Sequence, residues 1–234
     1  MLSLLFVPPL GGGMEIKMKK NFPIQLGKIY GNQKMSWLRV ILFAVGAGIY
    51  TGLVMLIPVL NNTSFQDIGI SYEWWVIFAV IIVVNCRKSL EAMMKCFVFF
   101  LISQPLVFVV EMVAGSLELE RAVYYYSEIW LPVTLLTLPG GLIAYYCKKQ
   151  NVFGAVVLGV GNTIQAVCGL AYFVVAVREF PHHFLSFLVC VGSILVMSFE
   201  IQKNRKKRLI SLVIPIVLLV MLIGFAAATD RLHV

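Results

Sequence analysis

The third apolar segment of the chain carries two polar residues that could take part in binding chemistry. Gln104 and Glu111 stand seven residues apart in the stretch SQPLVFVVE and therefore share one helical face. Pro105 leaves a backbone carbonyl without its usual partner one turn earlier. A polar, locally broken helix of this kind can hold a cation or a proton. Counted from Lys95 at the inner surface, however, Glu111 lies about 24 Å along the helix, so a glutamate facing the outer headgroups is the alternative.

The fifth apolar segment offers a second polar face, near the middle of the membrane. Asn162, Gln165 and Gly169 share one side of a helix in the stretch GVGNTIQAVCG. Amide side chains at this depth usually form hydrogen bonds to another helix. Midplane polar groups beside glycines also line binding cavities in transporters. Helix-to-helix bonding and substrate recognition are therefore both open for these residues.

The fourth apolar segment combines threonines with helix-breaking residues. Its stretch TLLTLPGG contains Thr134, Thr137 and Pro139 and is expected to kink or interrupt the helix. A kink alone is one interpretation, and a discontinuous helix that contributes backbone groups to a site is the other. The candidate ligand-binding residues of the whole chain are Gln104, Glu111, Thr134, Thr137, Asn162 and Gln165.

His182 and His183 are adjacent, with Glu179 nearby, and suggest a metal site at first sight. Neighbouring side chains on a helix point about 100° apart, so both rings could bind one ion only from a loop. We expect interfacial histidines and no bound metal. The chain also lacks HExxH, a GxSxG with a histidine partner and a phosphate-binding loop, so we expect no cofactor and favour a non-enzymatic role.

The composition decides which kind of fold positions these residues. The chain is 60% hydrophobic and 13% charged, against roughly 45–50% and about 25% in soluble domains. A soluble globule is excluded. Apolar runs of about 18 residues or more predict transmembrane helices, so we expect an all-α polytopic bundle with about seven spans over residues 37–229. The predicted spans are 37–60, 70–86, 93–114, 130–147, 152–177, 183–199 and 209–229.

The basic residues alternate between loops and predict the orientation of the bundle. With the amino terminus in the cytoplasm, the 19 Lys and Arg residues all lie inside except Arg121, Arg178 and Arg231. An odd number of spans then places the carboxyl terminus outside. The net charge of +8 belongs to the cytoplasmic face, where it predicts attraction to anionic lipids of the bilayer. It does not indicate nucleic-acid binding.

The two ends of the chain are expected to lie outside the membrane domain. Residues 1–36 predict a basic cytoplasmic arm, and residues 230–234 a short outer tail. The stretch MLSLLFVPPLGGG lacks a basic start and is interrupted by Pro8 and Pro9, so signal cleavage is not expected. Translation from Met14 or Met18 instead of Met1 is a further hypothesis, since the upstream glycine codons can encode a ribosome-binding sequence.

Four stretches carry a resemblance to known proteins: TSFQDIGISYEWW, VNCRKSLEAMMKCFVFFLISQPL, LLTLPGG and FPHHFLS. Over most of residues 37–200 the chain resembles a group of small uncharacterised polytopic membrane proteins of Gram-positive bacteria. The resemblance implies a multi-pass protein of a bacterial plasma membrane. It implies no activity and no site residue.

Three classes of function follow from these observations. The first is a transporter-like or small-ligand-binding bundle with its site between the third, fourth and fifth spans. The alternative is a non-catalytic accessory or scaffold subunit of a membrane complex, which the absence of motifs and the basic inner face favour; it requires a partner membrane protein. The third is a membrane-embedded enzyme, which would need Glu111 or the histidines as acid or base.

Overall fold

The computed structural model describes residues 29–31 and 33–230. This part of the chain consists of helices and turns without any strand, and six of its helices are long and apolar enough to cross a membrane. A further apolar helix, α4 (Tyr72–Val84), has 13 residues and covers only about 20 Å of a hydrocarbon core about 30 Å thick. The predicted all-α, multi-pass membrane fold is confirmed.

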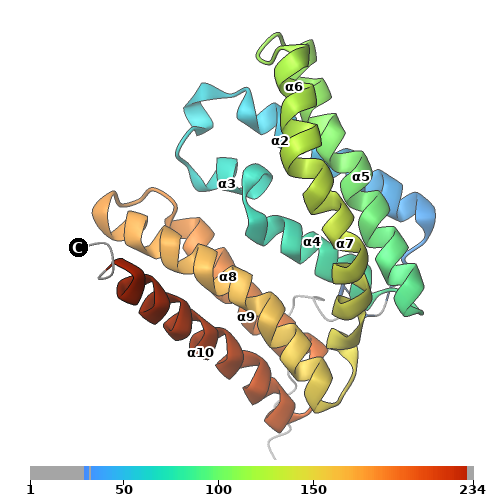
Figure 1. Ribbon diagram of the computed structural model, residues 1–234, viewed down its shortest axis with the longest axis vertical. Helices are drawn as coiled ribbons and strands as arrows, with labels where there is room; N and C mark the ends of the chain where they lie inside the picture. Colours follow the sequence, from blue (N-terminus) through green and yellow to red (C-terminus); the bar gives the residue numbers. More distant parts are fainter. Residues whose placement is uncertain (1–28, 32, 231–234) are drawn as a thin grey trace, which may run out of the picture.

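Two groups of helices flank α4 (Figure 1). The first group contains α2 (Trp37–Met55), α5 (Ser89–Val113) and a 30-residue rod over 119–148. The rod consists of α6 (Leu119–Tyr125), the π turn η2 (Tyr126–Trp130), α7 (Leu131–Ala144) and the 3-10 turn η3 (Tyr145–Lys148). The second group contains α8 (Val152–Arg178), α9 (Phe184–Ile201) and α10 (Arg205–Asp230). Helix α4 contacts α5 and α7 on one side and α8 and α9 on the other.

The second pass through the bundle is a broken helix. After α2 the chain forms the 3-10 turn η1 (Pro58–Leu60) and the short helix α3 (Ser64–Ile70), and α4 continues from it toward the other end of the molecule (Figure 1). Between the two helices Ser71 is extended, with φ −95° and ψ 149°. A helix interruption at membrane depth is tolerated only where protein or water satisfies the freed polar groups. The surroundings of Ser71 are therefore the first place to look for a site.

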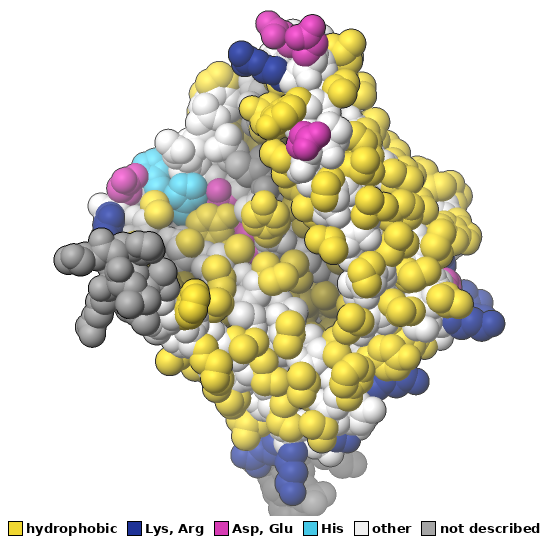
Figure 2. All heavy atoms as spheres, viewed as in Figure 1, with side chains coloured by type: hydrophobic (Ala, Val, Ile, Leu, Met, Phe, Trp, Pro, Cys, Tyr) yellow, Lys and Arg dark blue, Asp and Glu magenta, His cyan; other side chains and the backbone are white. Residues whose placement is uncertain are grey.

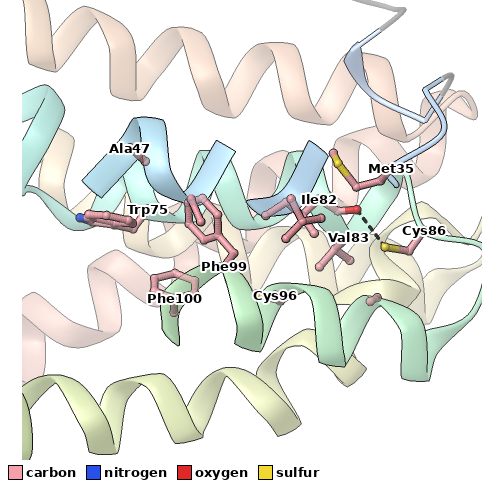
Figure 3. Close-up of a cluster of buried hydrophobic side chains, with 12 residues drawn as sticks. Met35, Ala47, Trp75, Ile82, Val83, Cys86, Cys96, Phe99 and Phe100 are labelled. Carbon is pink, nitrogen blue, oxygen red and sulfur yellow. Dashed lines mark hydrogen bonds between the residues drawn. The ribbon is translucent and has the colours of Figure 1, made fainter. Parts of the chain in front are cut away.

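Helix α4 is held to the first group by an apolar core (Figure 3). Ile82 and Phe99 are fully buried, and the ring of Phe43 lies 5.0 Å from that of Phe78 and 5.2 Å from that of Phe99. The thiol of Cys86 donates a hydrogen bond to the backbone oxygen of Ile82 at 3.2 Å (Figure 3). Close packing of this kind fixes the position of α4 relative to α2 and α5.

Glycines allow the closest helix contacts in both groups. A Cβ atom on Gly48 would lie 2.6 Å from the backbone oxygen of Ser103, and one on Gly52 would lie 2.7 Å from the Cβ of Val110. Helix α8 approaches α10 in the same way at Gly159. The hydrophobic effect does not drive helices together in lipid, so close packing stabilises their contacts instead. Small residues permit this packing because they let the backbones approach. The GxxxG of residues 48–52 therefore joins α2 to α5.

The helices differ from the predicted spans at several bounds; α5 and α10, for example, begin four residues earlier than predicted. Helix α2 ends at Met55, because Pro58 restricts the residue before it to an extended conformation. The predicted second span, 70–86, corresponds to α4 alone, whose helix ends at Val84. The fourth span, 130–147, is the second part of the longer rod. Most of the predicted arm 1–36, the tail after residue 230 and the alternative start codons lie outside the described residues.

Charged side chains separate along the long axis of the molecule. Figure 2 shows most of the visible Lys and Arg side chains toward the lower end and Asp, Glu and His side chains in the upper half. The lower end carries the α4–α5, η3–α8 and α9–α10 connections, which contain Arg87, Lys88, Lys149 and Lys203. We call it the basic end. A broad hydrophobic belt covers the middle of the molecule, as expected for a surface that faces lipid (Figure 2).

Candidate functional site

Buried and half-buried polar side chains gather around the break between α3 and α4. They come from α3, the start of α4, α8 and α9, and hydrogen bonds join them into one group, which we call the break cluster. Its members are Ser64, Asp67, Ser71, Glu73, Gln165, Tyr172, His183, Ser186 and Ser193. Polar groups at membrane depth are costly unless they are paired, so such a concentration marks a candidate site.

The carboxylate of Asp67 is buried, with 5% exposure, and residues at the start of α9 contact it. Its Oδ2 atom lies 2.7 Å from Nδ1 of His183 and accepts a hydrogen bond from the Ser186 hydroxyl at 2.6 Å. Ser64 accepts a bond from the backbone N–H of Ser186 at 3.2 Å. The carboxylate thus lies at the amino-terminal end of α9, where the helix dipole favours negative charge. These contacts join α3 to α9.

His183 stands in an uncommon backbone conformation. It caps the start of α9 with φ 57°, in the left-handed region that few residues other than glycine and asparagine adopt. Its ring stacks on Tyr172, with the two centroids 5.6 Å apart and the planes at 16°. Backbone strain of this kind persists only where surrounding contacts fix it. Here the contacts are those with Asp67 and Tyr172, so the ring is held between α3 and α8.

Glu73 is fully buried and lacks a compensating positive charge. Its Oε1 atom accepts hydrogen bonds from Ser71 at 2.6 Å and from Tyr172 at 3.0 Å, whereas Oε2 has no hydrogen-bond partner. No ion pair within residues 29–31 and 33–230 involves this side chain. Burial of a carboxyl group is costly unless a charge or hydrogen bonds compensate it. Glu73 therefore differs from Asp67, although both lie in the same cluster.

The hydroxyl of Ser71 connects the two carboxyl-bearing segments. It contacts the backbone oxygen of Asp67 as well as Oε1 of Glu73. A serine hydroxyl has only one hydrogen and cannot donate to both oxygens at once. The Ser71 side chain therefore links the end of α3 to the first turn of α4 across the break.

Gln165 anchors the start of α4 to the second helix group. Its Nε2 atom donates to the backbone oxygen of Glu73 at 2.8 Å, and its Oε1 atom accepts from Ser193 at 3.1 Å. Glu73 lies about 17 Å along α4 from Val84, near the middle of a hydrocarbon core about 30 Å thick. The cluster therefore occupies membrane depth. Of the six predicted site residues, Gln165 is the one with a hydrogen bond to this cluster in the described part of the chain.

Asn162 lies one turn away and has a different environment. Its Nδ2 atom donates to Ser198 at 3.0 Å and to the backbone oxygen of Ser211 at 3.4 Å, while Oδ1 has no partner. The side chain is fully buried. Asn162 thus joins α8 to α9 and α10, which is the helix-to-helix bonding that the sequence left as one of two alternatives.

The other four predicted residues lie on the first helix group. Gln104 and Glu111 line a small cavity of about 110 Å³ next to Trp75 and Trp130. Thr134 is fully buried with an unpartnered hydroxyl, and its backbone oxygen accepts from Thr137 at 2.6 Å. Thr137 also lines an apolar groove of about 370 Å³ between α4, α5, α7 and α8. Gln104 therefore lies near Glu111, and Thr134 lies near Thr137. The two pairs occupy different places in the first helix group.

Neither a metal site nor a hydrolytic triad emerges from the histidines. Nδ1 of His182 contacts the backbone oxygen of Asn62 at 3.0 Å, whereas Nδ1 of His183 contacts Asp67. The two rings therefore have different partners. The described residues contain no group of three or more His, Cys, Asp or Glu that could hold a metal ion. Ser186 donates to Asp67 and not to His183, whereas an activated serine needs the histidine as its base.

Sequence reasoning missed most of the break cluster. Ser71 and Glu73 stand at the start of the predicted span 70–86 and Asp67 lies just before it, where polar residues are also typical of the boundary of a span. Their spacing in that short segment was the available signal for a discontinuous helix. Ser186 and Ser193 give no signal, since serines are common in membrane helices.

Comparison of the chain with protein-family models, with curated proteins and with solved structures found no match. The break cluster is therefore interpreted from its own geometry.

Proposed function

We propose that the protein is a transporter-like helix bundle of a bacterial plasma membrane, in which the break cluster binds a small ligand together with a proton or a monovalent cation. The observation that carries this proposal is the fully buried, uncompensated carboxyl group of Glu73 beside the helix break at Ser71. Ionisable groups at membrane depth mark ion pathways and proton relays. Discontinuous helices form the binding sites of many transporters.

The two carboxyl groups have different roles in this proposal. Asp67 is compensated by His183 and the start of α9, so it holds the cluster together. Glu73 lacks such compensation, so it takes up and releases the proton or cation. A change of charge at Glu73 alters its contacts with Ser71, at the break itself, and with Tyr172 on α8. Binding is thereby coupled to the relative position of α3 and α4.

Space for a ligand lies on both sides of the cluster. The apolar groove of about 370 Å³ begins beside Tyr72 and Trp75 at the start of α4. A second groove of about 320 Å³ lies between α8, α9 and α10 and includes Gln165 and Gly169 among its lining residues. A small, mostly apolar ligand with one polar group suits these surroundings. By the rule that positive charge stays inside, the basic end is cytoplasmic and α3 lies toward the outside.

Infrared difference spectroscopy tests the proposal directly. Spectra of the full-length protein in lipid are compared between acidic and alkaline buffer, and between sodium and choline buffer. We expect the band of a protonated carboxyl group in the wild type, its loss in Glu73→Gln and its retention in Glu111→Gln. Identical spectra for the wild type and Glu73→Gln would refute a proton or cation site at Glu73.

Native mass spectrometry separates this proposal from an accessory-subunit role. The full-length protein is extracted gently from cell membranes and measured with and without the Tyr172→Phe substitution. A reproducible small-molecule adduct on the wild type that is lost in Tyr172→Phe supports a ligand site at the break cluster. A stoichiometric partner protein without any adduct would favour a non-catalytic subunit of a membrane complex.

A further inference from the structure

The basic end of the bundle contains a large pocket whose lining has more basic than acidic side chains. It has a volume of about 760 Å³ and lies between the segment around Tyr30, the α4–α5 turn, the η3–α8 turn and the α9–α10 turn. Its charged lining residues are Lys34, Arg87, Lys148, Lys149, Lys203 and Glu200. Glu200 pairs with Lys203 at 3.4 Å, which leaves the pocket with a surplus of positive charge.

Hydrogen bonds between turns hold the walls of this pocket in place. Asn85 accepts from the backbone N–H groups of Gly31 and Gln33 at 3.1 and 2.9 Å, and donates to the backbone oxygen of Ile29 at 2.6 Å. Gln150 donates to the backbone oxygen of Ile201 at 2.7 Å and accepts from the N–H of Lys203 at 2.9 Å. These bonds join segments that are far apart in the sequence. The pocket is therefore formed before any ligand binds, which lowers the cost of binding.

Lys148 and the backbone of Arg87 are held at the boundary between the pocket and the bundle. The ammonium group of Lys148 donates to the backbone oxygen of Cys86 and lies 4.1 Å from the centre of the Tyr145 ring. The Tyr145 hydroxyl donates to the backbone oxygen of Arg87 at 2.6 Å. Both basic residues line the pocket, and the Arg87 side chain is exposed there. Several cations around one pocket attract a group with more than one negative oxygen, such as a phosphate.

The apolar groove between α4, α5, α7 and α8 leads up to this pocket. On α4, Val83 lines the groove and the next residue, Val84, lines the pocket. Toward the end of the rod, Ala144 lines the groove and Lys148, one helical turn later, lines the pocket. The groove is lined mainly by aliphatic and aromatic side chains and glycines. A molecule that fills both spaces needs an anionic head and an apolar chain.

We propose that the pocket and the groove together form a specific site for a lipid with a phosphate group. The phosphate occupies the basic pocket, and one acyl chain lies along the groove toward Trp75. The site shares the groove with the ligand space beside the break cluster, but its basic pocket lies at the other end of α4 and does not depend on the function proposed for that cluster. It also goes beyond the general attraction of a basic surface for anionic lipids, because it assigns the head and the chain to defined cavities.

Two matched pairs of variants test the proposal. Arg87→Gln/Lys203→Gln removes two charges from the pocket, whereas Arg205→Gln/Lys206→Gln removes the same two residue types from the same end without touching the pocket. Gly161→Leu fills the groove, since a Cβ atom at Gly161 meets no atom within 4 Å. Gly192→Leu is its control on α9, where a Cβ atom likewise meets nothing within 4 Å and the residue lines neither of the two grooves described above.

Retention of lipid by the full-length protein is measured by native mass spectrometry in detergent, with phosphatidylglycerol, phosphatidylcholine or inorganic phosphate added. We expect preferential retention of phosphatidylglycerol, with a loss of about fivefold in affinity for each pocket charge removed. Gly161→Leu is expected to lower retention as well, and both controls to bind as the wild type does. Equal retention of phosphatidylcholine, or equal effects of pocket and control variants, would overturn the proposal. Displacement of the lipid by inorganic phosphate, with no effect of Gly161→Leu, would show a site for free phosphate instead.

Discussion

The Tyr172 hydroxyl donates a hydrogen bond to Oε1 of Glu73 at 3.0 Å, although the two residues stand 99 positions apart. This bond crosses from α8 to the first turn of α4, directly after the helix break at Ser71. Tyr172 also stacks on His183, which contacts Asp67 on the other side of the break. One tyrosine therefore faces both halves of the second pass, which makes it the link between the carboxyl groups.

Replacement of Glu73 by alanine is expected to destabilise the protein, whereas glutamine is expected to be tolerated. Alanine leaves the hydroxyls of Ser71 and Tyr172 without an acceptor and opens a cavity, at a cost of about 2–4 kcal/mol in the free energy of unfolding. Glutamine keeps an acceptor oxygen and the side-chain volume. Thermal unfolding in detergent measures both, with the exposed Glu118→Ala as control. A Glu73→Ala protein as stable as the control would contradict a structural role of these bonds.

The contact between Asp67 and His183 is expected to contribute measurably to stability. Asp67→Asn, His183→Asn and the double variant form a cycle, and we expect a coupling free energy of about 0.5–3 kcal/mol. Asparagine is chosen at position 183 because it tolerates the left-handed backbone there. His182→Asn, whose ring contacts a backbone oxygen only, should show no coupling to Asp67→Asn. Additive effects within the main cycle would mean that the contact between Asp67 and His183 does not contribute to the free energy of unfolding.

A methyl group added at Gly52 is expected to disrupt the close packing of α2 against α5. A Cβ atom there would lie 2.7 Å from the Cβ of Val110, so Gly52→Ala should cost about 1–3 kcal/mol. Gly46 lies on the same helix, and a Cβ atom there meets nothing within 4 Å. Gly46→Ala should therefore leave the unfolding temperature unchanged or raise it. Equal stability of the two variants would argue against the tight α2–α5 contact.

Length and hydropathy predicted the all-α membrane fold well because they depend on local properties of the sequence. Length and hydropathy are enough to define a long helix such as α5 or α8. The break cluster depends instead on contacts between distant residues, such as Gln165 with Glu73, which no local pattern contains. Periodicity placed Asn162 and Gln165 on one face. Only the packing of the helices decides that Gln165 meets α4 and Asn162 meets α10.

Cys86 is expected to resist thiol reagents in the folded protein. It lies in the turn between α4 and α5 with 2% exposure, and burial raises the pKa of its thiol to about 11. At pH 8 roughly one such thiol in a thousand is ionised, and only the thiolate reacts. Labelling by maleimide should therefore be slow, rise with pH toward 11 and become fast on unfolding. The Cys86→Ser protein provides the background from the other cysteines, and rapid labelling above that background at pH 8 would contradict this environment.

The orientation of the bundle can be tested with two single cysteines placed on opposite ends. Ser116 is exposed in the turn between α5 and α6, and Lys203 is exposed at the basic end. Because positive charge stays on the cytoplasmic side, Ser116→Cys should react with a membrane-impermeant maleimide in intact cells, and Lys203→Cys only after permeabilisation. The parent chain without either substitution measures labelling of the native thiols. The reverse pattern would place the basic pocket outside the cell and would contradict the proposed orientation of the bundle.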